Sequence, residues 1–209
     1  MARSKSSKAW LQRHVSDPYV REARAQGYRS RAAFKLLEIA RRDRLARAGS
    51  VVVDLGAAPG GWSQALAALV GPKGRVVALD LLEMAPIPGV TFIHGDFRDA
   101  VVRARIEGLV PRGGVDLVVS DMAPNLSGVG ATDQARSLDL CERALEFAVA
   151  HLQPSGAFLV KTFQGERYAE FLAAMRAAFA QVASRKPQAS RESSSEMYLL
   201  GRQPRAGAS

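Results

Sequence analysis

The sequence is poor in cysteine and has no long apolar run. Its one cysteine, Cys141, excludes an internal disulfide bond and a zinc site built from several cysteines. No stretch of about 18 consecutive apolar residues is present, which predicts that no helix crosses a membrane. The first dozen residues lack the apolar core of a secretory signal, and we therefore expect a cytoplasmic protein.

Acidic residues are scarce in the first quarter of the chain. Residues 1–50 contain 13 Lys and Arg but only 4 Asp and Glu, whereas residues 51–209 contain 16 of each sign. The net charge of +9 therefore comes entirely from the first quarter. A basic segment joined to a neutral body predicts a polyanionic partner, such as a nucleic acid or an anionic membrane face, although a solubilising surface would have the same composition.

The chain divides into four expected segments. Residues 1–12 are polar, basic and rich in serine, which is typical of a flexible arm. Residues 13–48 are expected to form two basic helices packed on the body, and residues 49–201 to form one α/β domain. Residues 202–209 are expected to be a disordered tail.

Local signals place the two N-terminal helices. Asp17, followed directly by a proline, predicts a helix start, and Gly27 follows where that helix would end. Ser30 then opens a second helix, whose apolar stripe includes Phe34 and Leu37.

Six short apolar segments follow residue 50, and helix-length segments separate several of them. The apolar segments are 51–55, 75–79, 90–93, 115–120, 157–161 and 196–200, and the helical segments are 61–70, 98–109, 133–152 and 166–180. Continuous apolar strands predict a sheet covered on both faces, and the alternation suits βαβ units. We therefore expect an α/β fold with a mostly parallel, doubly wound sheet. The last strand lacks an obvious crossover helix and is expected to pair antiparallel.

A glycine-rich loop, DLGAAPGGWS, joins the first predicted strand to the next helix. Ligands bind at such strand ends in doubly wound sheets, and Gly56 and Gly60 permit close approach of the backbone, although an ordinary turn is the alternative. The nicotinamide-binding pattern GxGxxG is interrupted by Ala58 and Pro59, and a proline lacks the N–H that a pyrophosphate needs. A nicotinamide-dependent oxidoreductase is therefore disfavoured.

Three acidic residues, Asp80, Asp96 and Asp121, end or follow three successive predicted strands. They are expected to form a row along one rim of the sheet, where Asp80 can bind both hydroxyls of a ribose. Each acid alone could cap a helix, as Asp96 could. A cofactor with a ribose, an adenine and a positive centre accounts for the three together, and S-adenosylmethionine has all of these.

Five motifs together resemble the RrmJ/FtsJ family of S-adenosylmethionine-dependent ribosomal RNA ribose 2′-O-methyltransferases. They are DLGAAPGGWSQ, LD at 79–80, GDF at 95–97, SDMAPN at 120–125 and VKTFQGE at 160–166. The resemblance runs from residue 10 to residue 200 and includes SRAAFKLLEI at 30–39, which lies outside the cofactor motif. It implies a Rossmann-like methyltransferase fold, with a mostly parallel seven-stranded sheet, helices on both faces, and residues 49–201 as the methyltransferase domain.

The resemblance also implies the residues of the site. The family's Lys-Asp-Lys-Glu tetrad is matched by Lys35, Asp121, Lys161 and Glu196. The family's contacts to S-adenosylmethionine are matched by Gly60, Trp62, Asp80, Asp96 and Asp121.

No metal is expected, because the three histidines share no metal-ligand spacing. Cys141 lies in a predicted helix among apolar residues, and we interpret it as a buried core thiol and not as a nucleophile.

Two roles are open for Lys161. A ribose 2′-hydroxyl is a poor nucleophile, so catalysis must align it with the methyl group and remove its proton. A lysine that accepts this proton must be neutral, which burial and neighbouring positive charge would favour. Alternatively, Lys161 stays protonated and orients the hydroxyl while water takes the proton.

The resemblance implies a uridine of 23S ribosomal RNA as the substrate, in the assembled large subunit. Residues 13–48 are then the RNA-binding segment of a protein expected to be a monomer. Basic residues near Lys35 and ahead of the last strand are expected to contact phosphates, namely Arg29, Arg31, Arg185, Lys186 and Arg191. A transfer RNA or other RNA substrate, and a non-catalytic ribosome-assembly factor, are the alternatives.

Overall fold

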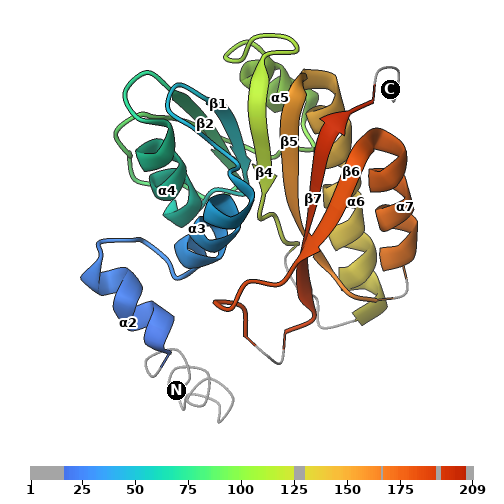
Figure 1. Cartoon of the computed structure of the whole chain (residues 1–209), viewed down its shortest axis with the longest axis horizontal. Helices are drawn as coiled ribbons and strands as arrows, with labels where there is room; N and C mark the ends of the chain where they lie inside the picture. Colours follow the sequence, from blue (N-terminus) through green and yellow to red (C-terminus); the bar gives the residue numbers. More distant parts are fainter. Residues whose placement is uncertain (1–16, 125–129, 166, 192–193, 206–209) are drawn as a thin grey trace.

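The predicted α/β class is confirmed by a computed structural model that describes residues 17–124, 130–165, 167–191 and 194–205 (Figure 1). The strands are β1 (Val51–Leu55), β2 (Arg75–Asp80), β3 (Val90–His94), β4 (Val115–Ser120), β5 (Leu152–Phe163), β6 (Phe179–Arg185) and β7 (Glu196–Pro204). The helices are α2 (Pro18–Ala25), α3 (Ala32–Asp43), α4 (Gly61–Val70), α5 (Ala100–Glu107), α6 (Gly130–His151) and α7 (Tyr168–Ala178). No helix within these ranges is long and apolar enough to span a membrane.

The strands form one seven-stranded sheet in the order β3-β2-β1-β4-β5-β7-β6. The first five strands of the chain run parallel, and β7 runs antiparallel to both β5 and β6. The chain moves outward from β1 to β3 and then returns to β4 on the other side of β1. The topological switch point therefore lies between β1 and β4, where doubly wound proteins bind their ligands. The mostly parallel sheet and the antiparallel last strand are both as predicted.

Two segments correct the sequence predictions. The sequence predicts a helix over 166–180 and then a loop up to the last strand. In the structure the helix α7 ends at Ala178, and residues 179–185 form the edge strand β6. Small and polar residues dominate this strand, so it lacks the continuous apolar run of a buried strand. The predicted disordered tail is wrong at its start, because β7 continues to Pro204 and Arg202 pairs with β5.

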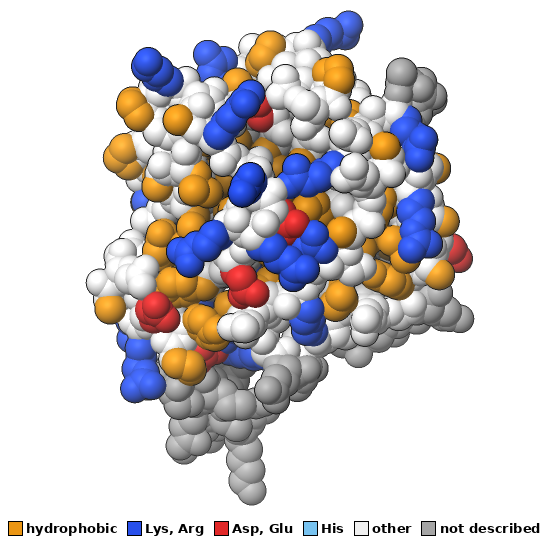
Figure 2. All heavy atoms as spheres, viewed as in Figure 1, with side chains coloured by type: hydrophobic (Ala, Val, Ile, Leu, Met, Phe, Trp, Pro, Cys, Tyr) orange, Lys and Arg blue, Asp and Glu red, His pale blue; other side chains and the backbone are white. Residues whose placement is uncertain are grey.

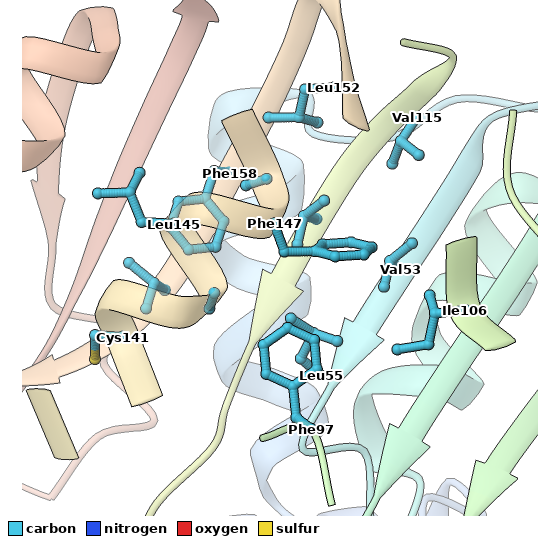
Figure 3. Packing of buried hydrophobic residues seen from close by; sticks show 14 of the residues in the cluster. Val53, Leu55, Phe97, Ile106, Val115, Cys141, Leu145, Phe147, Leu152 and Phe158 are labelled. Atoms are coloured by element: carbon cyan, nitrogen blue, oxygen red, sulfur yellow. The ribbon is translucent and has the colours of Figure 1, made fainter. Parts of the chain in front are cut away.

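Helices cover both faces of the sheet (Figure 1). The larger core lies under α5, α6 and α7, and Figure 3 shows Phe147 of α6 among side chains from the strands, including Val53 and Leu55. The second core lies under α3 and α4 and contains Leu36 and Trp62 with residues of the sheet. Burial of the second core fixes α3 and α4 on the same face, which matters because α3 carries Lys35.

The helix α2 begins where the sequence predicts. Asp17 caps it by accepting a hydrogen bond from the Tyr19 N–H at 3.1 Å, and Asp17 also pairs with Arg31. Tyr19 and Tyr28 both contact Phe34 of α3, with ring centroids 5.8 and 5.7 Å apart. These two tyrosines therefore anchor the N-terminal segment to the body of the protein.

Candidate active site

The carboxyl ends of the parallel strands meet at one edge of the sheet, the lower edge in Figure 1. The loop after β1 is tightly packed at this edge. Gly56 has a φ of 83°, and a Cβ there would lie 2.7 Å from the main-chain nitrogen of Met122. Gly60 has a φ of 109°, and its Cβ would lie 2.7 Å from Ile87 Cδ1 and 2.8 Å from Met84 Sδ. The path of this loop therefore depends on glycine at both positions.

Asp80 ties the end of β2 to the same loop. One carboxylate oxygen accepts a hydrogen bond from the Ala58 N–H at 2.8 Å, and the other accepts one from the Leu82 N–H at 2.8 Å. Each carboxylate oxygen can accept a further hydrogen bond. The side chain is thus fixed in orientation and can still accept hydrogen bonds from two neighbouring hydroxyl groups, as a ribose presents.

Asp54 is a buried acid beneath this edge. One oxygen accepts a hydrogen bond from Ser63 Oγ at 2.6 Å, and the other has no partner among the described residues. Burial raises the pKa of Asp54 to about 7, and the charges of Asp121 and Asp80 act in the same direction. Three acidic residues, Asp54, Asp80 and Asp121, thus interact at this edge, which suits a ligand that carries a positive centre.

Two of the predicted cofactor residues are used differently from Asp80. The Asp96 carboxylate pairs with the Arg98 guanidinium at 2.6 Å, and this hydrogen bond lowers the pKa of Asp96. Asp96 does not cap the following helix, because Asp99 is the N-cap of α5. Trp62 is 3% exposed and donates its ring N–H to the main-chain oxygen of Ala32 at 2.8 Å. Any ligand contact by Trp62 must therefore come from its main chain.

The four residues of the predicted tetrad lie together as two ion pairs. Lys35 Nζ lies 2.7 and 2.9 Å from the two carboxylate oxygens of Glu196. Lys161 Nζ lies 3.0 Å from an Asp121 carboxylate oxygen and 2.6 Å from the Asp121 main-chain oxygen. All four side chains are largely buried, with exposed fractions between 9% and 21%. Burial alone would raise the pKa of Glu196, but Lys35, with Lys161 and Ser190, outweighs it and lowers the pKa.

The register of β5 and β7 explains how the pairs meet. Lys161 lies opposite Tyr198, and Glu196 lies two residues earlier on the same strand, so all three side chains share one face of the sheet. Tyr198 belongs to the core beneath α3, which places this face toward Lys35. Asp121 follows the neighbouring strand β4 directly.

Tyr198 is a site residue that the sequence predictions missed. Its hydroxyl donates to an Asp121 carboxylate oxygen at 3.4 Å, and Lys35 Nζ lies 5.9 Å from its ring centroid. Burial raises the pKa of the Tyr198 hydroxyl, so it stays protonated at neutral pH. The two-residue spacing from Glu196 is the signal that could have identified it, because such residues share one face of a strand.

Several cations that were expected to contact phosphates are engaged within the protein. Arg31 bonds to the main-chain oxygen of Ala189, and Arg29 donates to three main-chain oxygens. Arg185 ends β6, not a loop, and its guanidinium pairs with Asp43 at 2.6 and 2.7 Å. Figure 2 shows Lys and Arg side chains gathered beside acidic ones over the region between α3 and β7.

Lys186 is engaged in a similar way. Its ammonium donates to the main-chain oxygen of Glu196 at 2.9 Å, and so fixes the first residue of β7. Of the five expected phosphate contacts, only Lys186 and Arg191 are exposed, and the Arg191 side chain is 46% exposed.

Cys141 is a buried core thiol, as predicted. It is 3% exposed, its Sγ donates to the main-chain oxygen of Lys161 at 3.2 Å, and burial raises its pKa to about 12. Among the residues that the structure describes, no group of three or more His, Cys, Asp or Glu could hold a metal ion.

A doubly wound sheet, a glycine-dependent loop after β1 and an anchored acid at the end of β2 define a Rossmann-like class of proteins that bind a nucleoside cofactor. The acids at the rim suit the cationic sulfonium of S-adenosylmethionine better than a pyrophosphate. The chain matches the model of the FtsJ-like methyltransferase family over residues 28–204 and belongs to that family. It is a methyltransferase, and its methyl donor is S-adenosylmethionine.

Curated relatives match over almost the whole chain. The sequence is 59% identical to the ribosomal RNA large subunit methyltransferase E of Chromobacterium violaceum, over 97% of this chain and 98% of that protein. It is 58% identical to the protein of the same name from Azoarcus sp. (strain BH72), over 96% of this chain and 98% of the relative. A crystal structure of a ribosomal RNA methyltransferase from Plasmodium falciparum is similar, with a TM-score of 0.75, 25% identity and coverage of 85% of this chain and 98% of the other.

Proposed function

We propose that the protein transfers a methyl group from S-adenosylmethionine to the ribose 2′-hydroxyl of a uridine in 23S ribosomal RNA, within the assembled large subunit in the cytoplasm. The observation that carries the proposal is the pair of buried ion pairs, Lys35–Glu196 and Lys161–Asp121, beside the cofactor loop. The names of the curated relatives support ribosomal RNA of the large subunit as the substrate. The site is formed within one chain, and we propose that a monomer is active.

Lys161 has the central role in the proposed mechanism. Bound S-adenosylmethionine supplies a methyl group on a positively charged sulfur. An ammonium has three donors, and Lys161 directs two of them to the Asp121 carboxylate and main-chain oxygens. The third donor is available for the ribose oxygen, whose free lone pair it orients along the line of attack. In this role Lys161 remains protonated, and water takes the hydroxyl proton.

The second pair, together with Tyr198, maintains the position of the first. Lys35 is bound to both oxygens of Glu196, and Ser190 Oγ donates to one of those oxygens at 3.0 Å. Tyr198 donates to Asp121 on the other side. Loss of either pair would leave a charge buried without its partner, which is costly and would displace its neighbours.

The first experiment measures methyl transfer. Wild type and Lys161→Ala would receive labelled S-adenosylmethionine with large subunits, naked 23S ribosomal RNA or transfer RNA. We expect label at a ribose of the large subunit with wild type, and a loss of about 10²–10⁴-fold with the variant. Equal labelling by both proteins would refute the proposed mechanism. Preferential labelling of transfer RNA would refute the proposed substrate.

We assign RNA binding to exposed cations of the N-terminal segment. Arg21 and Arg24 lie exposed on α2, which Figure 1 places beyond the carboxyl edge of the sheet. Replacing both with Ala should weaken RNA binding and lower the slope of log affinity against log salt by about 2 if each contacts one phosphate. Arg176→Ala is the matched control, because Arg176 is exposed on α7 on the opposite face. An unchanged slope in the double variant would remove α2 from the interface.

A further inference from the structure

The connection between α2 and α3, together with the first residue of α3, is attached to the first turn of α4. The Arg29 main-chain N–H donates to Gln64 Oε1 at 2.8 Å, and Gln64 Nε2 donates to the Gly27 main-chain oxygen at 3.1 Å. The ring N–H of Trp62 donates to Ala32 at 2.8 Å. The helix that begins at the cofactor loop is therefore attached to the N-terminal segment at three points.

The side chain of Arg29 extends this attachment to the loops themselves. Its guanidinium donates to the main-chain oxygens of Ala85 at 2.6 Å, Pro86 at 2.8 Å and Pro59 at 3.3 Å. Pro59 belongs to the loop after β1, whereas the other two belong to the loop after β2. One planar group thus connects both loops, and Arg29 Cδ also lies 3.1 Å from where a Cβ on Gly60 would be.

These two loops enclose one side of the cofactor site. Met84 and Ile87, from the loop after β2, are buried with Ala57 from the loop after β1 in a small core of their own. This core has few members, and Arg29 adds hydrogen bonds from one guanidinium to main-chain oxygens of both loops. Asp80 accepts a hydrogen bond from the Ala58 N–H, and it lies directly before the loop after β2.

Arginine suits this task for a geometric reason. A guanidinium presents five N–H donors in a rigid planar fork, whereas a lysine ammonium presents three donors at one point. Three acceptors on two loops can be satisfied by the fork at once. A lysine would retain the positive charge and could still contact a phosphate, but its donors all lie on one nitrogen, so it would reproduce these contacts to two loops poorly.

We propose that Arg29 is a positioning residue for the cofactor loops and not a contact to RNA phosphate. The proposal rests on the proposed function, because it takes these loops to be the S-adenosylmethionine site. Replacing Arg29 should weaken cofactor binding while RNA binding without cofactor is retained. This separates Arg29 from Arg24, which has the same charge and belongs to the same basic segment but lies exposed on α2.

The experiment compares Arg29→Lys with Arg24→Ala in the full chain. The dissociation constant for S-adenosylhomocysteine would be measured by calorimetry, and that for the RNA of large ribosomal subunits by filter binding without cofactor. For Arg29→Lys we expect cofactor binding weakened by about tenfold or more, equivalent to about 1.4 kcal/mol, and RNA binding within twofold of wild type. For Arg24→Ala we expect the reverse.

Kinetics and hydrogen exchange separate positioning from general destabilisation. In Arg29→Lys the KM for S-adenosylmethionine should rise while kcat at saturating cofactor stays within a few-fold of wild type. The amides of Gly60 and Gly61 should exchange faster, and those of β4 at the wild-type rate. Gln64→Ala, which removes a neighbouring attachment, should change cofactor binding in the same direction if Arg29→Lys folds poorly.

Two results would overturn the proposal. Weakened RNA binding with unchanged cofactor binding in Arg29→Lys would make Arg29 a phosphate contact. Unchanged binding of both ligands would remove it from the site altogether. Failure of wild type to bind S-adenosylhomocysteine would instead overturn the proposed function, together with the assignment that rests on it.

Discussion

Lys35 and Glu196 lie 161 positions apart in the sequence, yet both oxygens of the Glu196 carboxylate are within 2.9 Å of Lys35 Nζ. Lys35 comes from the N-terminal helix α3, and Glu196 is the first residue of the last strand. Because Lys35 keeps the pKa of Glu196 low despite burial, the glutamate remains charged at neutral pH. An ionic contact inside the site thus joins α3 to the last strand, β7.

The residues of this pair should act as a unit. Lys35→Ala and Glu196→Gln should each reduce kcat/KM by about 10²-fold or more, because each leaves the other group buried without its partner. The double variant should be little worse than the more damaged single variant. Single-turnover methyl transfer across the four proteins measures this. Multiplicative losses would contradict a shared role.

Asp54 should make stability depend on pH. Its pKa is raised to about 7 in the folded protein, against 3.8 for an ordinary aspartate, so the folded state binds a proton that the unfolded chain has released. The free energy of unfolding therefore falls as pH rises from about 4 to 7. Asp54→Asn mimics the protonated form, so its stability advantage over wild type should grow with pH by up to about 1.4 kcal/mol per unit.

Urea unfolding of wild type and Asp54→Asn at several pH values between 5 and 8 measures the difference in their free energies of unfolding. The contributions of the other titrating groups cancel in this difference. A difference that stays constant with pH would show that Asp54 is ionised in the folded protein throughout the range.

Gly56→Ala should disrupt both the fold and the site. The new Cβ would lie 2.7 Å from the Met122 nitrogen, so the residue that follows Asp121 must move. Gly113→Ala is a matched control, because Gly113 also has a positive φ of 59° but nothing lies within 4 Å of its Cβ position. We expect Gly113→Ala to cost about 1 kcal/mol, and Gly56→Ala to cost more and to lose methyl transfer. Equal losses of stability and activity in both would mean that contact with Met122 is unimportant.

Cys141 should be unreactive while the protein is folded. The thiolate is the reactive form, and a pKa of about 12 makes it rare at pH 8. Ellman's reagent should therefore react about 10³-fold more slowly with the native protein than with the protein in urea. Similar rates in both states would mean that the thiol is accessible.

The sequence alone was sufficient for the parts of the fold that depend on local pattern. Apolar strand runs and the proline after Asp17 predicted the parallel sheet and the start of α2, both of which are confirmed. The edge strand β6 was missed because its side chains are only partly buried and carry no apolar run. Strand position alone placed Asp80 at the rim, since the end of a strand is a local property.

The contacts within the site were beyond sequence reasoning for a physical reason. Composition reveals that Arg29 is charged, but not that three main-chain oxygens from two loops lie within its reach. Tyr198 likewise acquires its role from the register of β7 against β5, which no local pattern specifies. The phosphate contacts were predicted from charge alone. In the structure, several of these cations instead form hydrogen bonds or ion pairs within the protein.

The position of β7 also determines when, during synthesis of the chain, the sheet and the site can be completed. This strand lies between β5 and β6, and it is the last strand of the sheet to leave the ribosome as the chain is made. Until β7 has been synthesised, β6 has no neighbour to join it to the sheet, and before residue 196 is added Lys35 has no glutamate. A prematurely terminated chain could form the cofactor loop and β1–β4, but it would lack Glu196 and Tyr198. Such fragments should therefore lack methyl-transfer activity.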